Sequence, residues 1–105
     1  MKIKWYLFIL AFFAGVFLVN SLPHFINGIS GNHFPTPFAN PPGKGLSSST
    51  LNVIWGGTMF LTGFVFLYFS KAGMKNIPLL LTVFAGGFLM AIRLSIVLID
   101  KLPPS

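Results

Sequence analysis

Three long apolar stretches constrain this 105-residue chain more than any other feature of its sequence. They cover approximately residues 5–22, 51–70 and 77–99. A helix needs about 20 apolar residues to cross about 30 Å of hydrocarbon at about 1.5 Å per residue, and each stretch is close to that length. The sequence therefore predicts an all-α integral membrane protein, in which three transmembrane helices form a single membrane domain.

The composition excludes several classes of protein. Only 8% of the residues are charged, compared with about 25% in a soluble domain, and 54% are hydrophobic. The polar surface is too small to coat a water-soluble globule, which excludes a cytosolic enzyme and a disordered tail. The net charge is +6, but the basic residues are scattered and form no patch for nucleic acid. The chain has no cysteine, which excludes disulfide scaffolds and thiol catalysis.

The two connections between the stretches differ greatly in length. Residues 71–76 form a short turn, which predicts that the second and third helices are an antiparallel hairpin, with Pro78 in the first turn of the third helix. Residues 23–50 form a long loop that is rich in apolar residues and contains one lysine, Lys44. We expect this loop to be an ordered cap that buries its apolar side chains, namely Phe25, Ile26, Ile29, Phe34 and Phe38.

The positions of the lysines predict an orientation in the membrane. Lys2 and Lys4 precede the first stretch, and Lys71 and Lys75 lie in the short turn, which two crossings place on the same side. Cytoplasmic flanks carry the excess of Lys and Arg. We therefore expect a multi-pass protein of the cell (inner) membrane, with its N-terminus in the cytoplasm and with the long loop and the C-terminus outside.

The first stretch has an alternative interpretation. A basic start followed by an apolar run is also typical of a secretory signal peptide. Cleavage after this stretch would leave a two-span hairpin. The apolar run is long for a signal peptide and no small-x-small cleavage site follows it cleanly, so three spans remain the prediction.

Small residues follow helical stripes on these stretches. In lipid, helices associate through small residues that allow close backbone approach, and through polar contacts. One stripe is predicted on the first stretch, one on the second and two on the third, so we expect the third helix to be central or to contact another subunit. The stripe on the first stretch is Leu7, Ala11, Ala14, Leu18 and Ser21. The stripe on the second stretch is Asn52, Gly56, Met59, Gly63, Phe66 and Ser70. Those on the third are Thr82, Gly86, Leu89, Arg93, Ile96 and Asp100, and separately Gly87, Ala91 and Ser95. The predicted helix-packing residues are Gly56, Gly63, Gly86, Gly87, Ala91 and Ser95.

Arg93 is the one ionisable residue well inside a predicted span. An unpaired arginine in hydrocarbon costs at least about 2.5 to 3.5 kcal/mol, so it needs water or a partner. Two interpretations stay open. Arg93 either extends toward the outer interface or pairs locally with Asp100, or it binds an anionic ligand. The candidate ligand-binding residues are Arg93, His24, His33, Asn27, Asn52 and Asp100, because the polar residues of the long loop lie on the side that Arg93 faces.

The same residues limit the possible chemistry. His24 and His33 are nine positions apart, which is no recognised metal spacing, and no cysteine completes such a site, so we expect no metal and no cofactor. Asp100 is the only acidic residue, which excludes catalysis by paired carboxylates.

Three functions remain. The leading hypothesis is a non-catalytic accessory or assembly subunit in the lipid bilayer, as a homo-oligomer or in a larger membrane complex, with no nucleic-acid partner. The alternative is an outer-leaflet site or enzyme, in which Arg93 holds an anionic ligand or lipid and His24 or His33 moves a proton. The third is a subunit of an oligomeric channel or transporter, since three helices alone enclose too little space for a substrate path.

Overall fold

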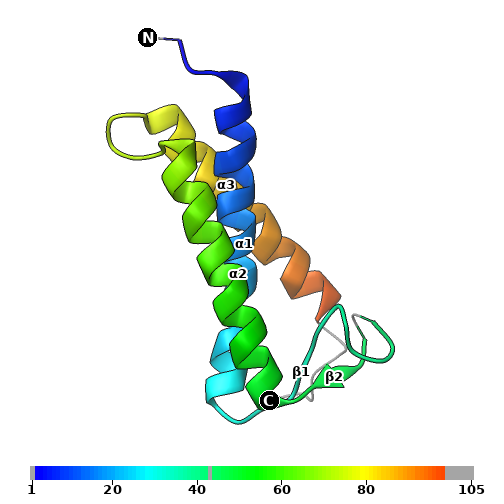
Figure 1. The fold of residues 1–105 in the computed structure, drawn as a ribbon. Helices are drawn as coiled ribbons and strands as arrows, with labels where there is room; N and C mark the ends of the chain where they lie inside the picture. Colours follow the sequence, from blue (N-terminus) through cyan, green and yellow to red (C-terminus); the bar gives the residue numbers. More distant parts are fainter. Residues whose placement is uncertain (1, 43, 99–105) are drawn as a thin grey trace.

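Three long helices dominate the structure, a computed structural model that describes residues 2–42 and 44–98. They are α1 (Trp5–Ile29), α2 (Ser49–Ser70) and α3 (Ile77–Val97), shown in Figure 1. Each is long and apolar enough to cross a membrane, with a length of about 31 to 38 Å at about 1.5 Å per residue. Two short strands, β1 (Phe34–Pro35) and β2 (Leu46–Ser47), pair as an antiparallel ribbon between α1 and α2. The architecture is therefore helical, as predicted.

The first helix is longer than the sequence analysis predicted. We expected it to end at Leu22, before Pro23, but α1 continues through Pro23 to Ile29. Proline removes one intrahelical hydrogen bond, and the two turns that follow it are held by packing against α2. At Gly28, an ideal Cβ would lie 2.7 Å from the backbone nitrogen of Val53, so the two backbones are in close contact there.

The helix ends in a Schellman motif, a common C-terminal arrangement. Gly31 adopts a positive φ of 79°, and the Asn32 N–H donates to the Asn27 carbonyl over 2.8 Å. The long connection is therefore shorter than predicted, and residues 30–48 form what we call the cap. Of the five apolar residues expected to be buried in this region, only Phe34 is buried. Phe25, Ile26 and Ile29 project from the extended α1, and they and Phe38 are exposed.

The central element of the bundle is α1. It packs along both α2 and α3, whereas α2 and α3 make few or no direct contacts with each other. In Figure 1, α1 and α2 run side by side and α3 crosses α1 at an angle. The short turn joins α2 to α3 in sequence, but the predicted hairpin of these two helices is not a packing unit, and α3 is not the central helix.

The interface between α1 and α2 uses the stripe predicted on α2. Its buried members are Asn52, Gly56, Met59, Gly63 and Ser70. An ideal Cβ at Gly56 would lie 2.7 Å from the backbone nitrogen of Phe25, and one at Gly63 would lie 2.8 Å from Cγ of Leu18. Glycine is therefore required at both positions for the helices to approach this closely.

The interface between α1 and α3 is built on glycines from both helices. A Cβ at Gly15 would overlap the carbonyl oxygen of Val83, and a Cβ at Gly86 would overlap the carbonyl oxygen of Phe12. Gly87 lies beside them, where a Cβ would come within 2.9 Å of Cγ2 of Val19. The helices thus cross in backbone contact. The predicted packing residues did not include Gly15, because they were chosen on the second and third stretches.

Most of the remaining residues of the two stripes predicted on α3 are not packed, although Thr82 is half-buried. Leu89, Arg93 and Ile96 of the first stripe are exposed, and so are Ala91 and Ser95 of the second. Asp100 lies outside the described residues. The physical reason is that α3 has a single neighbouring helix, so only the face around Leu79, Gly86, Gly87 and Met90 is covered.

The crossing of α1 and α3 gives a first prediction. We expect Gly86→Ala and Gly15→Ala each to lower the free energy of unfolding in detergent by about 1 to 3 kcal/mol, because a methyl group must displace backbone atoms. Gly57→Ala is the matched control, since an ideal Cβ there meets no atom within 4 Å. We expect it to raise stability by up to about 1 kcal/mol through helix propensity. Equal unfolding curves for Gly86→Ala and Gly57→Ala would contradict the close crossing.

Candidate functional site

The predicted ligand-binding residues do not converge on one site. His24 and Asn52 meet in a buried cluster under the cap, whereas Arg93 lines a separate cavity between the cap and α3. Asn27 donates from Nδ2 to the Pro23 carbonyl over 2.8 Å, and His33 is exposed on the cap. Within residues 2–42 and 44–98, no three His, Cys, Asp or Glu side chains gather into a possible metal site.

The buried cluster is organised by Asn52, which is 0% exposed. Its amide nitrogen, Nδ2, faces three backbone carbonyl oxygens: those of Phe34, Ser47 and Ser48, at 3.1, 3.2 and 3.0 Å. Its amide oxygen, Oδ1, lies 2.9 Å from Nδ1 of His24. Because this oxygen can only accept a hydrogen bond, Nδ1 of His24 carries the proton.

The cluster fixes the cap to the helices. His24 belongs to α1, Asn52 to α2, and the accepting carbonyls of Phe34 and Ser47 to the two strands of the ribbon. The His24 ring also meets the buried Phe34 ring edge to face, with centroids 5.2 Å apart. Both ends of the Asn52 amide are used by partners within the protein, so this side chain holds the structure together and leaves no group for a ligand.

Two further hydrogen bonds extend the cluster. The Oγ1 of Thr36 and the Oγ of Ser47 are 2.6 Å apart, which ties the two strands together. The Oγ of Ser48 accepts from the N–H of Leu51 over 3.2 Å and caps the N-terminus of α2. The path of the cap is therefore determined by hydrogen bonds to the first turn of α2.

The second feature is a cavity of about 290 Å³, which we call the Arg93 cavity. It is bounded by α1, by the last turns of α3 and by the cap. Its lining residues are Asn20, Pro35, Thr36, Pro37, Pro42, Lys44, Arg93, Leu94, Val97 and Leu98. Arg93 lies four residues before the end of α3, about 6 Å along the helix axis.

Positive charge dominates the Arg93 cavity. Arg93 and Lys44 are the charged residues of its lining, and Asn20 and Thr36 supply neutral polar groups. The only acidic residue of the chain, Asp100, lies outside the described residues. One carboxylate can offset at most one of the two cations. Arg93 was predicted from the sequence as a ligand-binding residue, whereas Lys44, Asn20 and Thr36 were not, because they meet at the cavity only through the way in which the cap folds back over α3.

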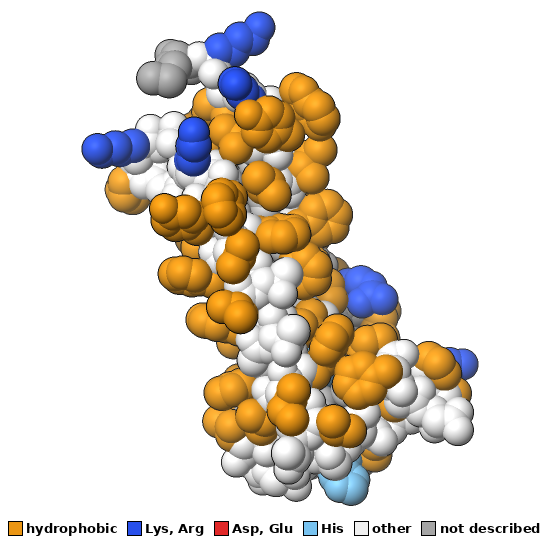
Figure 2. Space-filling view, viewed as in Figure 1, with side chains coloured by type: hydrophobic (Ala, Val, Ile, Leu, Met, Phe, Trp, Pro, Cys, Tyr) orange, Lys and Arg blue, Asp and Glu red, His pale blue; other side chains and the backbone are white. Residues whose placement is uncertain are grey.

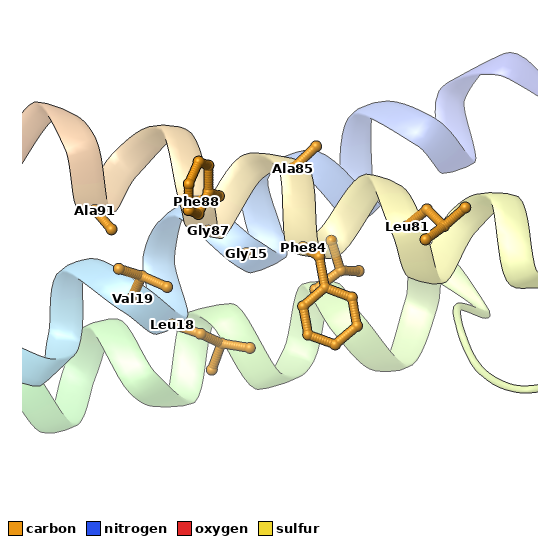
Figure 3. A pocket seen from close by; sticks show the side chains of 10 residues that line it. Gly15, Leu18, Val19, Leu81, Phe84, Ala85, Gly87, Phe88 and Ala91 are labelled. Atoms are coloured by element: carbon orange, nitrogen blue, oxygen red, sulfur yellow. The ribbon is translucent and has the colours of Figure 1, made fainter.

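An apolar groove follows the boundary of α1 and α3, and Figure 3 shows the side chains around the point where Gly15 and Gly87 meet. This part has a volume of about 660 Å³ and a wholly apolar lining that includes Leu81, Phe84 and Phe88. A second part, of about 420 Å³, shares Val19 and Ala91 with the first and continues toward the cap end of α3. We call the two parts together the α1–α3 groove.

The Asn52 cluster gives a second prediction. We expect Asn52→Leu to open the cap, because the substitution leaves His24 and the facing carbonyls without partners, at about 1 to 3 kcal/mol for each unsatisfied group. The natural absence of cysteine allows a clean measurement. A Ser47→Cys substitution at the 7% exposed Ser47 should react slowly with a maleimide, and much faster when combined with Asn52→Leu.

Asn32→Leu is the control for this experiment, since Asn32 is exposed and its side chain makes only a 3.5 Å contact with Oδ1 of Asn27. It should leave the labelling rate of the cysteine at position 47 unchanged. Equal rates for the Asn52→Leu and Asn32→Leu variants would show that Asn52 does not hold the cap closed.

Comparisons of the chain with protein-family models, with curated proteins and with solved structures found no match. Its function is therefore inferred from its own residues and their geometry.

Proposed function

We propose that the chain is a three-span membrane protein with a non-catalytic role in assembly, and that it associates through the α1–α3 groove with a second copy of itself. The observation that carries the proposal is the exposed pair Ala91 and Ser95, four residues apart at the edge of this groove. Most small residues of the helices already pack against a neighbouring helix, but Ala91 and Ser95, like Ala85 and Gly57, do not.

The nature of the surface supports a membrane setting. Large apolar side chains are exposed along all three helices, including Phe13, Phe64 and Phe88 at 44, 55 and 69%. Figure 2 shows apolar side chains along the visible face of the bundle. Such a surface is unfavourable in water and suits a lipid environment, in which exposed phenylalanine and leucine are normal.

Within lipid, the groove is the part of the surface best suited to another helix. Helix association in membranes depends on small residues and on filling of space. Gly87 is already covered by Val19 of α1, whereas Ala91 and Ser95 continue the same helical stripe without a neighbouring helix. A second α3 offers the same small stripe in return, so a symmetric pair is self-complementary.

An orientation completes the proposal. Lys2 and Lys4 precede α1, and Lys71 and Lys75 lie beside the α2–α3 turn, at the same end of the molecule (Figures 1 and 2). With the excess of basic residues on the cytoplasmic side, this end faces the cytoplasm and the cap lies outside.

The self-association is tested with purified protein in mild detergent. We expect a disulfide-linked dimer to form readily when Ala91→Cys is the only cysteine in the chain, because the two α3 helices bring position 91 of each copy together. We expect Ala91→Leu to shift the protein from dimer to monomer in mass measurements, since the larger side chain blocks close approach.

Gly57→Cys and Gly57→Leu are the matched controls on α2. The Gly57→Cys variant should remain uncrosslinked, and the Gly57→Leu variant should remain dimeric. A monomeric wild-type protein would overturn the proposal, as would crosslinking through position 57 but not through position 91.

The orientation is tested in intact cells. We expect Ser30→Cys on the cap to react with a membrane-impermeant maleimide added outside, because the cap lies on that side. Met74 lies in the α2–α3 turn and is 82% exposed, so a cysteine placed there by Met74→Cys should react only after the cells are opened. The opposite pattern of labelling would reverse the orientation.

A further inference from the structure

We propose that the Arg93 cavity binds a phosphate group, either the head group of an anionic phospholipid or free phosphate. This proposal is independent of the self-association through the α1–α3 groove. It depends on the meeting of a cap residue, Lys44, with a residue of α3, Arg93, at one cavity.

The charges supply the first argument. Arg93 and Lys44 line one cavity from two different elements, and their like charges repel each other across it. The walls here include Leu94, Val97 and Leu98. The chain contains a single acidic side chain, so its side chains neutralise at most one of the two cations. A bound anion offsets this repulsion, and arginine and lysine are the residues that most often hold phosphate.

The neutral polar groups supply the second argument. Asn20 is in the middle of an apolar helix, and its Nδ2 lies 3.5 Å from Sδ of Met59. A thioether sulfur is a weak acceptor, so an amide N–H of Asn20 remains available for a stronger one. A phosphate oxygen in the cavity is such an acceptor. Asn20 lines the cavity and thus adds a neutral amide to its two cations.

Size and position supply the third argument. At about 290 Å³, the cavity is at the lower end of the range of about 300 to 1,000 Å³ for small-molecule sites, which suits a phosphate with a short attached group. Leu94 and Leu98 line both the cavity and the adjoining part of the α1–α3 groove. A charged group in the cavity therefore lies next to an apolar surface, which is the combination that a phospholipid presents.

Lipid binding is tested with the full chain purified in neutral detergent. Native mass spectrometry measures how much phosphatidylglycerol or phosphatidylcholine the protein retains. We expect a preference for phosphatidylglycerol that weakens about tenfold in Arg93→Gln, which corresponds to about 1.4 kcal/mol. Lys44→Gln should weaken it in the same direction. Because Lys44 is exposed on the cap, this second variant keeps the test valid if Arg93→Gln does not fold.

Two lysines at the other end of the molecule provide matched controls. Lys71→Gln and Lys75→Gln remove the same charge without touching the cavity, and their retention of phosphatidylglycerol should stay within about twofold of wild type. Equal weakening by all four substitutions would show that net charge alone attracts the lipid. That result would overturn the proposal, as would equal retention of the two lipids by the wild-type protein.

Inorganic phosphate distinguishes the two sources of the anion. If millimolar phosphate displaces phosphatidylglycerol from the wild-type protein and raises its melting temperature, the cavity accepts a free anion. If phosphatidylglycerol binds selectively and phosphate has neither effect, the ligand is a lipid. Either result supports the site, provided that Arg93→Gln or Lys44→Gln removes the effect. An effect that persists in both variants would overturn it.

Discussion

Close backbone contact between α1 and its two neighbours is the constraint on which the rest of the structure depends. Helices that are apolar enough to cross a membrane, as these three are, associate in lipid through contact surfaces that fit through small residues. Gly28 and Gly15 of α1 supply this fit toward α2 and α3, respectively, and Gly56 and Gly86 supply it from the other side. Since α2 and α3 make few or no contacts with each other, loss of either interface would leave one helix attached only by its loop. The polar features at the cap end are positioned by this three-helix arrangement.

Much of this fold could be predicted from the sequence, because it follows from length and periodicity. Three apolar stretches predicted three helices, and the stripe from Asn52 to Ser70 predicted the face of α2 that is buried. The extension of α1 past Pro23 was not predicted, because a proline normally marks a helix boundary and only the contact with α2 stabilises the added turns. The stripes on α3 were misjudged for a related reason. On an apolar helix, periodicity identifies possible faces, but the number of neighbouring helices decides which are used.

The sequence also predicted the polar residues of the candidate sites better than it predicted which of them lie together. Arg93 was identified because a charge within an apolar stretch is conspicuous. Its partners in the cavity were not identified, because Lys44 and Thr36 reach it through the fold of the cap. His24 and Asn52 were grouped with Arg93 only because all three were expected near the same side of the membrane. Their hydrogen bond to each other, and the carbonyls that saturate Asn52, separate them from it. Sequence reasoning located the polar residues at the correct end of the helices, but three-dimensional contacts were needed to divide them into a structural cluster and a cationic cavity.

The way in which Asn52 holds the cap has a consequence for how freely the cap can change. Its amide binds the main-chain oxygens of Phe34, Ser47 and Ser48, which any amino acid in those positions would also present. The side chains that also hold the cap are those of Phe34, Thr36, Ser47 and Ser48. The remaining exposed side chains of the cap lie outside this cluster, so exchanging them leaves these bonds in place. A chain of this kind can acquire a different surface on its cap, with a new charge or a new recognition loop, while its three helices stay the same.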